Sequence, residues 1–170
     1  MRPVAFVVPF LFETSVRFLR AALAIPGLSV GLISTDPLER FPEDVRSRVA
    51  GHWRVGNCLD ADQLVAGAKG LASQLGGLER IVGVLEQAQV PIAEARAALG
   101  LPGLSVEAAN RFRDKALMKD TLRAGGIPCA RHKLCHTADE ARQWFAALNA
   151  PVVMKPPAGA GAVNTMRIDT

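Results

Sequence analysis

A single lysine stands where an apolar run of the chain meets a loop of small residues. In PVVMKPPAGAGAVNT, residues 151–165, Lys155 follows a run apolar enough for a buried strand, and Gly159 and Gly161 lie in the loop. Glycines there remove side-chain bulk and permit positive φ, so backbone N–H groups can converge on an anion. A plain hairpin turn with a lysine beside it explains the same composition. The loop therefore raises the hypothesis of a phosphate site, although it lacks the GxxxxGK[ST] pattern of a P-loop.

A second group of cations recurs at helical spacing. In RFRDKALMKDTLRAGG, Arg111, Lys115 and Lys119 are four residues apart, so one helix would carry them as a single stripe. Like charges at this spacing destabilise an isolated helix by about 0.2–0.5 kcal/mol per pair. A solvated helix face is the simpler interpretation. The functional interpretation is that one of these cations faces the same anion as Lys155.

The elements before residue 104 alternate between strand-like and helix-like patterns. We expect strands at 4–10, 28–33, 52–55 and 78–85, and helices at 13–24, 60–74 and 91–99, with a short helix within 34–50. This alternation predicts an α/β fold with a doubly wound, Rossmann-like parallel sheet. No GxGxxG follows the first strand, which disfavours an enzyme that binds NAD or a nucleotide sugar on this sheet.

A different unit begins at Ser105, a favourable helix N-cap. One helix is expected from there to Arg123 or Ala124, and a strand from Cys129 to Cys135. Thr137 and Glu140 form the pattern of a capping box for a helix over 138–148. Strands at 151–154 and 165–168 flank the small-residue loop.

The composition disfavours several classes of protein. The net charge of +4 and the isoelectric point of about 9.3 come from charges spread along the chain, unlike the dense basic patch of a nucleic-acid-binding protein. No apolar segment is long enough to span a membrane. Cys58, Cys129 and Cys135 lack metal-ligand spacing, so we expect reduced thiols in a cytoplasmic protein. No triad pattern involves the three histidines, which we expect to be surface or half-buried residues: His52, His132 and His136.

Four segments, in order and with sensible gaps, resemble the ATP-grasp superfamily. They are RDKALMK (113–119), AGGIPCARH (124–132), TADEARQWFAALNAPVVMKP (137–156) and AGAGA (158–162). Upstream, VLEQAQVPIAEARAALGLPG (84–103) resembles the end of the Rossmann-like domain that precedes ATP-grasp domains. The resemblance implies a pre-ATP-grasp Rossmann-like domain at 1–104, followed by a truncated α+β first ATP-grasp subdomain at 105–170.

The same resemblance implies a nucleotide site. Lys115 and Lys155 would contact ATP phosphates, and a flexible loop would close over them, formed by Gly159, Ala160, Gly161 and Ala162. A third loop glycine common in the family aligns with Asn164, which tolerates the left-handed conformation better than most residues. The basic or serine residue often found after the second glycine is replaced by Ala162-Val163, which reduces the donors available to the γ-phosphate.

The implied parent enzyme is an ATP-dependent ligase that joins a small carboxylate to an amine or thiol through an acyl phosphate. In this family the adenine-binding hinge, the acidic Mg²⁺ ligands and the catalytic arginine follow the glycine-rich loop. We therefore expect a fragment that is inactive alone, with no catalytic residue and with its metal ligands beyond residue 170; Asp169 is read as a solvated carboxylate. A homodimer is compatible with the sequence. The alternative is a non-catalytic α/β binding module without nucleotide dependence.

Overall fold

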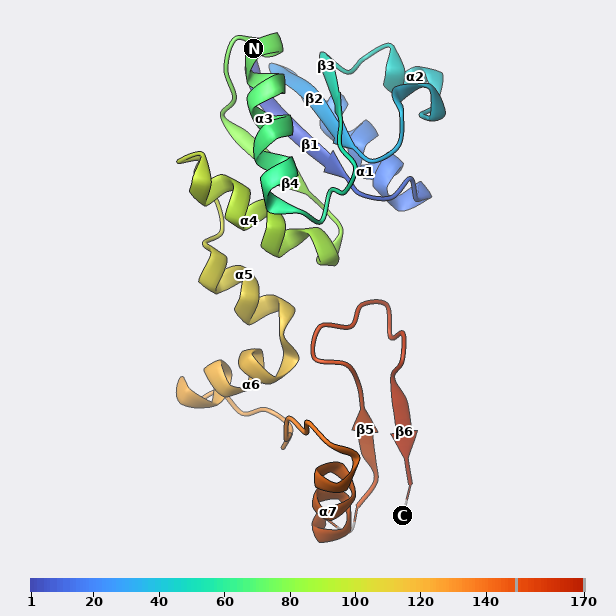
Figure 1. Ribbon diagram of the computed structural model, residues 1–170, viewed down its shortest axis with the longest axis vertical. Coiled ribbons are helices and arrows are strands. Elements are labelled where there is room, and N and C mark those ends of the chain that lie inside the picture. The colour runs from blue at the N-terminus through green and yellow to red at the C-terminus, as the bar shows by residue number, and fades with distance from the viewer. Residues whose placement is uncertain (149, 170) are drawn as a thin grey trace. The chain divides into compact units, whose positions relative to one another are not determined.

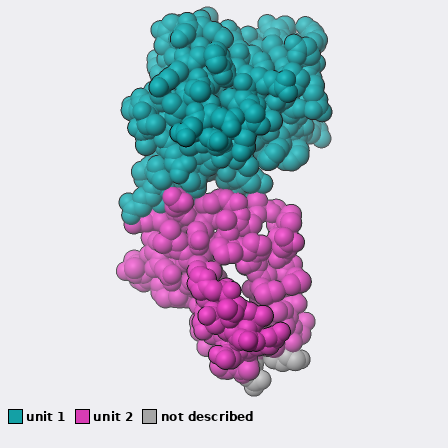
Figure 2. Space-filling model, viewed as in Figure 1, with its two compact units in different colours: residues 1–109 teal, residues 110–170 magenta. Residues whose placement is uncertain are grey.

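A computed structural model describes residues 1–148 and 150–169 (Figure 1). The chain divides into two compact units, Met1–Ala109 and Asn110–Thr170 (Figure 2). Each unit is described by itself below.

A four-stranded parallel sheet forms the centre of the first unit. Its strands are β1 (Arg2–Val8), β2 (Leu28–Ser34), β3 (Gly51–Arg54) and β4 (Arg80–Gly83), in the spatial order β3-β2-β1-β4. The α-helices between and after them are α1 (Glu13–Leu23), α2 (Glu43–Arg46), α3 (Ala61–Leu75) and α4 (Gln89–Ala98), with short 3₁₀ turns η1 (Leu38–Arg40) and η2 (Glu86–Ala88). This confirms the predicted α/β fold with a parallel sheet.

Both faces of the sheet are covered, which explains the continuous apolar runs in its strands. Successive side chains of a strand point to opposite faces. On β1, Ala5 and Val7 belong to one core cluster, together with residues of α3 and α4. Phe6 and Val8 belong to the other, together with residues of α1 and α2. The first strand ends at Val8 rather than at the expected Phe10, because Pro9 has no N–H for the ladder.

The second unit contains helices and one hairpin. Helix α5 (Val106–Arg113) spans the division between the units, and α6 (Lys115–Ala124) and α7 (Ala138–Leu148) follow. Strands β5 (Val152–Met154) and β6 (Met166–Ile168) pair antiparallel, which confirms the strands expected on either side of the loop. None of the described residues of 110–169 is buried, so this unit has no core of its own.

Helix α7 begins as expected. The Thr137 hydroxyl accepts the N–H of Glu140 at 3.2 Å, as in a capping box. The Glu140 carboxylate accepts the N–H of His136 at 2.8 Å, one residue before the position that the box requires. This backbone hydrogen bond lowers the pKa of Glu140.

The expectation of one helix from Ser105 to Ala124 is wrong, because the chain breaks at Asp114. Ser105 does cap α5, since its hydroxyl accepts the N–H of Ala108 at 3.1 Å. Asp114 then adopts extended backbone, with φ −92° and ψ 117°, and α6 starts after it. Arg111 and Lys115 therefore belong to different helices, and the predicted stripe of Arg111, Lys115 and Lys119 does not form on one helix.

The expected strand from Cys129 to Cys135 is also wrong. A strand requires a ladder partner, and in the described part of this unit the only ladder joins β5 to β6. The carbonyl of Ala130 instead accepts the guanidinium of Arg123 at 3.3 Å. This segment has no period-2 alternation of apolar residues, and the predicted strand depended on the place of the segment between Pro128 and the cap of α7.

Candidate functional site

The start of α6 is fixed by an aspartate. The Asp114 carboxylate accepts the backbone N–H groups of Ala116 at 2.8 Å and Leu117 at 2.9 Å. These are two of the N–H groups that a helix leaves unsatisfied at its N-terminus. Lys115 is consequently the first residue of α6, and its position depends on this cap.

Lys115 contacts the glycine-rich loop through both its main chain and its side chain. Its backbone N–H donates to the carbonyl of Pro157 at 3.0 Å. Its ammonium group donates to the carbonyl of Gly159 at 2.6 Å and lies 3.5 Å from the Pro157 oxygen. Arg113 also donates to the Gly159 carbonyl, at 3.3 Å. The structure thus brings one of the two predicted lysines to the predicted loop, across 44 positions of sequence.

The loop is built from two consecutive tight turns. Gly161 and Ala162 have φ of 61° and 59°, and the Val163 N–H donates to the Ala160 carbonyl at 3.2 Å. Positive φ at both central residues is the mark of a type I′ turn. Asn164 has φ 56° in the next turn, where the Thr165 N–H donates to the Ala162 carbonyl at 3.1 Å. The expectation that Asn164 adopts the left-handed conformation in place of a glycine is confirmed.

The two loop glycines serve different purposes. Gly161 uses positive φ, whereas Gly159 does not, and the N–H of Gly159 donates to the Pro156 carbonyl at 3.3 Å. Gly159 therefore offers its carbonyl oxygen to the cations, not its N–H to an anion. The N–H groups of Ala160, Gly161 and Ala162 have no acceptor among the described residues, so they remain available to a ligand.

Lys155 directly follows β5 and is exposed. Within residues 1–148 and 150–169, its ammonium group has no hydrogen-bond or ion-pair partner. That the ammonium groups of Lys115 and Lys155 point into one cavity stays a prediction.

The two units differ in charge. Residues 110–170 hold ten Lys and Arg against five Asp and Glu, whereas residues 1–109 hold ten against eleven. The net positive charge therefore belongs to the unit with the glycine-rich loop, and the charges are less evenly spread than the sequence pattern suggested. A net positive unit attracts anions such as phosphate groups.

A hollow of about 470 Å³ lies beside the first turns of α6. It is lined by Asp114, Ala116, Leu117, Asp120, His132, Lys133 and Leu134. His132 Nε2 lies 3.4 Å from the Asp120 carboxylate, and His132 Nδ1 is buried without a partner in the described part of the chain. None of the predicted phosphate-binding residues lines this hollow.

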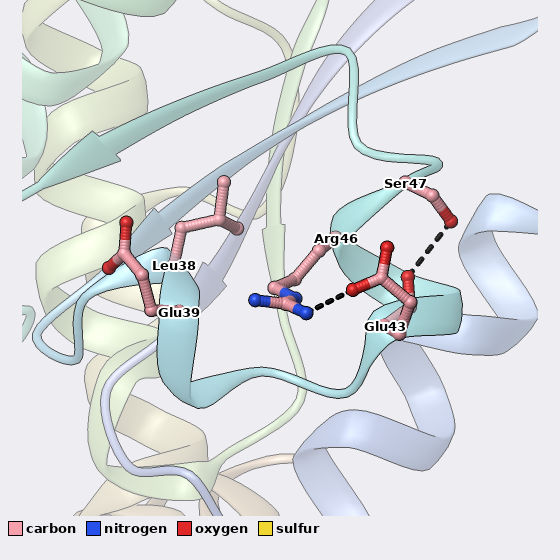
Figure 3. A pocket seen from close by; sticks show the side chains of 5 residues that line it. All are labelled: Leu38, Glu39, Glu43, Arg46 and Ser47. Atoms are coloured by element: carbon pink, nitrogen blue, oxygen red, sulfur yellow. Dashed lines mark hydrogen bonds and ion pairs between the residues drawn. The ribbon is translucent and has the colours of Figure 1, made fainter.

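A second hollow, of about 290 Å³, lies over η1 and α2 of the first unit (Figure 3). Of its lining residues, Arg46 pairs with the Glu43 carboxylate and Ser47 donates to the Glu43 carbonyl. Three of its polar residues therefore pair with one another, and it contains no predicted site residue.

The remaining candidate groups do not assemble into a site. Among the described residues, no three histidine, cysteine, aspartate or glutamate side chains are grouped to hold a metal ion. Cys58 is buried, and Cys129 and Cys135 are half-buried free thiols. His52 and His132 are half-buried and His136 is exposed, as expected. The described part of the chain has no helix that could cross a membrane.

Two residues that build this site were not predicted. No capping role was predicted for Asp114, although an aspartate just before an apolar helical run is a recognised N-cap signal. Arg113 opens the RDKALMK segment, but no local pattern predicts its contact with the Gly159 carbonyl, because Gly159 lies 46 positions later.

The curated proteins that this chain matches in sequence are ligases. No family model matches the chain. Alanine–anticapsin ligase of Bacillus subtilis is 32% identical over 81 residues, which cover 47% of this chain and 17% of that protein. Phosphoribosylamine–glycine ligase of Caulobacter vibrioides is 35% identical over 115 residues, which cover 65% of this chain and 26% of that protein.

Solved structures share the fold. L-amino acid ligase from Bacillus licheniformis has a TM-score of 0.67 at 21% identity, over 100% of this chain and 39% of that one. A second structure is the biotin carboxylase domain of Hydrogenobacter thermophilus 2-oxoglutarate carboxylase, which was crystallised with MgADP, ADP and bicarbonate. Its TM-score is 0.76 at 18% identity, and the match covers 99% of this chain and 37% of that one.

The chain spans less than a third of the length of the curated relatives it matches, at most 29%. The sequence relatives and the shared fold agree with the four motif segments, whose order includes the Arg-Asp-Lys run and the small-residue loop. The chain therefore shares the fold of these ligases, and its four motif segments resemble the ATP-grasp superfamily.

Proposed function

We propose that this chain supplies the triphosphate-binding part of an ATP-dependent ligase, which joins a carboxylate to an amine or thiol through an acyl phosphate. The observation that carries the proposal is the contact between the Lys115 ammonium and the Gly159 carbonyl, at 2.6 Å. It brings a cation from a helix start to a loop whose next three N–H groups have no acceptor among the described residues. Cation and N–H groups together are what phosphate oxygens require.

The chemistry needs positioning and neutralisation of charge. ATP supplies the γ-phosphoryl group that activates the carboxylate. Lys115 and Lys155 neutralise the phosphate oxygens from two different elements, the start of α6 and the end of β5. The loop from Gly159 to Ala162 covers the phosphates and excludes water from the reactive intermediate.

The names of the relatives support the carboxylate–amine class. By its name, phosphoribosylamine–glycine ligase joins an amine to an amino acid, and alanine–anticapsin ligase joins an amino acid to a second molecule. For Mg²⁺, the described residues offer no group of three suitable side chains, so they do not fit a metal site by themselves. No step of the proposal therefore passes through Mg²⁺, whose ligands we expect beyond residue 170.

Titration of the chain with ATP, followed by NMR, tests this function. We expect weak binding that shifts the amide signals of α6 and of the loop. Replacing either Lys115 or Lys155 with methionine should weaken binding about tenfold to a hundredfold, since a hydrogen bond to a charged group contributes about 1.5–3 kcal/mol. Arg142→Met is the matched control, because this arginine lies in the same unit and pairs, among the described residues, with the exposed Asp139.

The alternative function is an α/β binding module without nucleotide dependence. It predicts no response to ATP in the wild type and no difference in either lysine variant. A parallel titration with NADH checks for a dinucleotide site on the parallel sheet. Nucleotide binding confined to the first unit would contradict the proposal.

Three further expectations belong to the same proposal. The 170 residues alone should not turn over ATP, because the described residues offer no group of three side chains that could hold Mg²⁺. Steady ADP production by the purified chain would contradict this.

The three free thiols support a reducing, cytoplasmic location. A homodimer is tested by sedimentation; one structural neighbour, the biotin carboxylase domain, was crystallised as a dimer.

A further inference from the structure

We propose that Arg113 is a positioning residue for the glycine-rich loop. It keeps hold of the Gly159 carbonyl, and so keeps the loop on α6, when a phosphate draws the Lys115 ammonium away. This inference rests on the proposed function, because the phosphate is the ligand proposed for Lys115.

Two cations share one acceptor. The Gly159 oxygen accepts from the Lys115 ammonium at 2.6 Å and from the Arg113 guanidinium at 3.3 Å. A carbonyl oxygen has two lone pairs, so both donors are accommodated together. The shorter contact dominates in the ligand-free chain, since hydrogen bonds weaken with distance. Arg113 is thus a second donor, poised on an oxygen that Lys115 occupies more closely.

The two side chains differ in how easily they change partners. An ammonium group is a compact charge with three rotatable donors, whereas a guanidinium presents its donors in a fixed planar fork. A phosphate oxygen carries negative charge, so it offers the ammonium a Coulomb attraction that an uncharged carbonyl does not. A phosphate oxygen therefore attracts the Lys115 ammonium more strongly than the uncharged Gly159 carbonyl does. Arg113, at the end of α5, lies on the other side of the Asp114 break.

The consequence is a division of roles between neighbouring residues. Lys115 turns to the anion, and Arg113 takes over the loop carbonyl. Without Arg113, binding of the anion would remove the side-chain anchor of the loop, and the backbone contact between Lys115 and Pro157, at 3.0 Å, would remain as its attachment to the start of α6.

That backbone contact provides the probe. The exchange rate of the Lys115 amide hydrogen reports whether the Pro157 carbonyl, and with it the loop, is docked on α6. We would measure this rate by NMR in the wild-type chain, Arg113→Gln, Arg113→Lys and the control Arg142→Gln. Each is measured without anion and with inorganic tripolyphosphate, raised until the signals of that protein stop shifting.

The expected result is a difference that appears only with the anion. Without tripolyphosphate, all four proteins should exchange the Lys115 amide at rates within about twofold, because Lys115 itself holds Gly159. With tripolyphosphate, Arg113→Gln should exchange about tenfold faster than the wild type, near the lower end of what a hydrogen bond to a charged group contributes. Arg113→Lys should restore part of the protection, and Arg142→Gln should match the wild type.

Two results would overturn the inference while leaving the proposed function intact. One is an Arg113→Gln chain that exchanges just as fast without the anion, which would show a structural role. The other is an Arg113→Gln chain that binds tripolyphosphate and keeps the wild-type exchange rate. If tripolyphosphate leaves the wild-type signals of α6 and the loop unshifted, the proposed function and this inference fail together.

Discussion

Replacing Asp114 with alanine should loosen the first turn of α6 and the loop that docks on it. The substitution removes the acceptor of two backbone N–H groups, at 2.8 and 2.9 Å. Loss of an N-cap destabilises a helix by about 1 kcal/mol. Loss of a negative charge at the helix N-terminus adds about 0.3–1 kcal/mol. The sum, about 1.5 kcal/mol, corresponds to roughly tenfold faster amide exchange in α6.

Amide exchange resolved by residue is the suitable assay, because none of the described residues of the second unit is buried in a core whose melting could be followed. Ala116 and Leu117 lose their acceptor directly. Lys115 should follow them, since its N–H reaches Pro157 only while α6 starts at this residue. Asp114→Asn separates the two contributions: asparagine caps as well as aspartate, so only the charge term of about 0.3–1 kcal/mol should be lost.

Asp120→Ala is the matched control, because it removes an exposed carboxylate from the same helix without removing a cap. The reasoning is refuted if Asp114→Ala leaves the exchange of Ala116, Leu117 and Lys115 at the wild-type rate. It is also refuted if Asp114→Asn and Asp114→Ala behave alike, since the effect would then come from charge alone.

Three further predictions concern the pH response, the loop and the hairpin. Burial lowers the pKa of His52 in the folded chain, so the unfolded state binds the proton more readily. The free energy of unfolding of the first unit should therefore fall as the pH drops below about 6.5. Denaturant titrations should show a weaker dependence of this free energy on pH in His52→Gln. Asn164→Val forces a β-branched residue to φ 56° and should speed exchange of the next amide about tenfold, whereas Asn164→Gly should not, as NMR would report. Met154 and Met166 are paired across the hairpin, and they are 43% and 53% exposed. The chain should therefore self-associate in sedimentation experiments, and replacing both residues with glutamine should reduce the association. A wild-type chain that stays monomeric at every concentration would contradict this.

The parallel sheet could be predicted from the sequence because its signals are local. Strands β1 and β2 are short apolar runs, and two-sided burial makes such runs continuous. Strand β3, Gly-His-Trp-Arg, is not such a run. The end of β1 was misplaced by two residues because Phe10 extends the apolar run, although Pro9 cannot continue the ladder. Boundaries set by hydrogen bonding are thus less visible than elements set by burial.

The break at Asp114 could not be predicted from periodicity. Apolar and charged residues continue at helical spacing from α5 into α6, so composition alone favours one helix. Two contacts favour the break: the side-chain cap on α6, and the bond from the Lys115 N–H to the Pro157 carbonyl. The first contact is local and was recognisable. The second joins residues far apart in sequence, and no local pattern contains it.

The ligand-free geometry of Lys115 is itself an argument about the site. An ammonium group has three donors, and in the described structure it makes one short bond, to the Gly159 oxygen, and one long approach, to the Pro157 oxygen. Uncharged carbonyls therefore leave its charge unneutralised and part of its hydrogen-bonding capacity unused. A purely structural lysine would be better satisfied by a carboxylate, yet Asp114, the neighbouring acid, is committed to backbone N–H groups. The described residues thus hold a cation at the base of a small-residue loop without a carboxylate partner, and an anionic ligand would complete that arrangement.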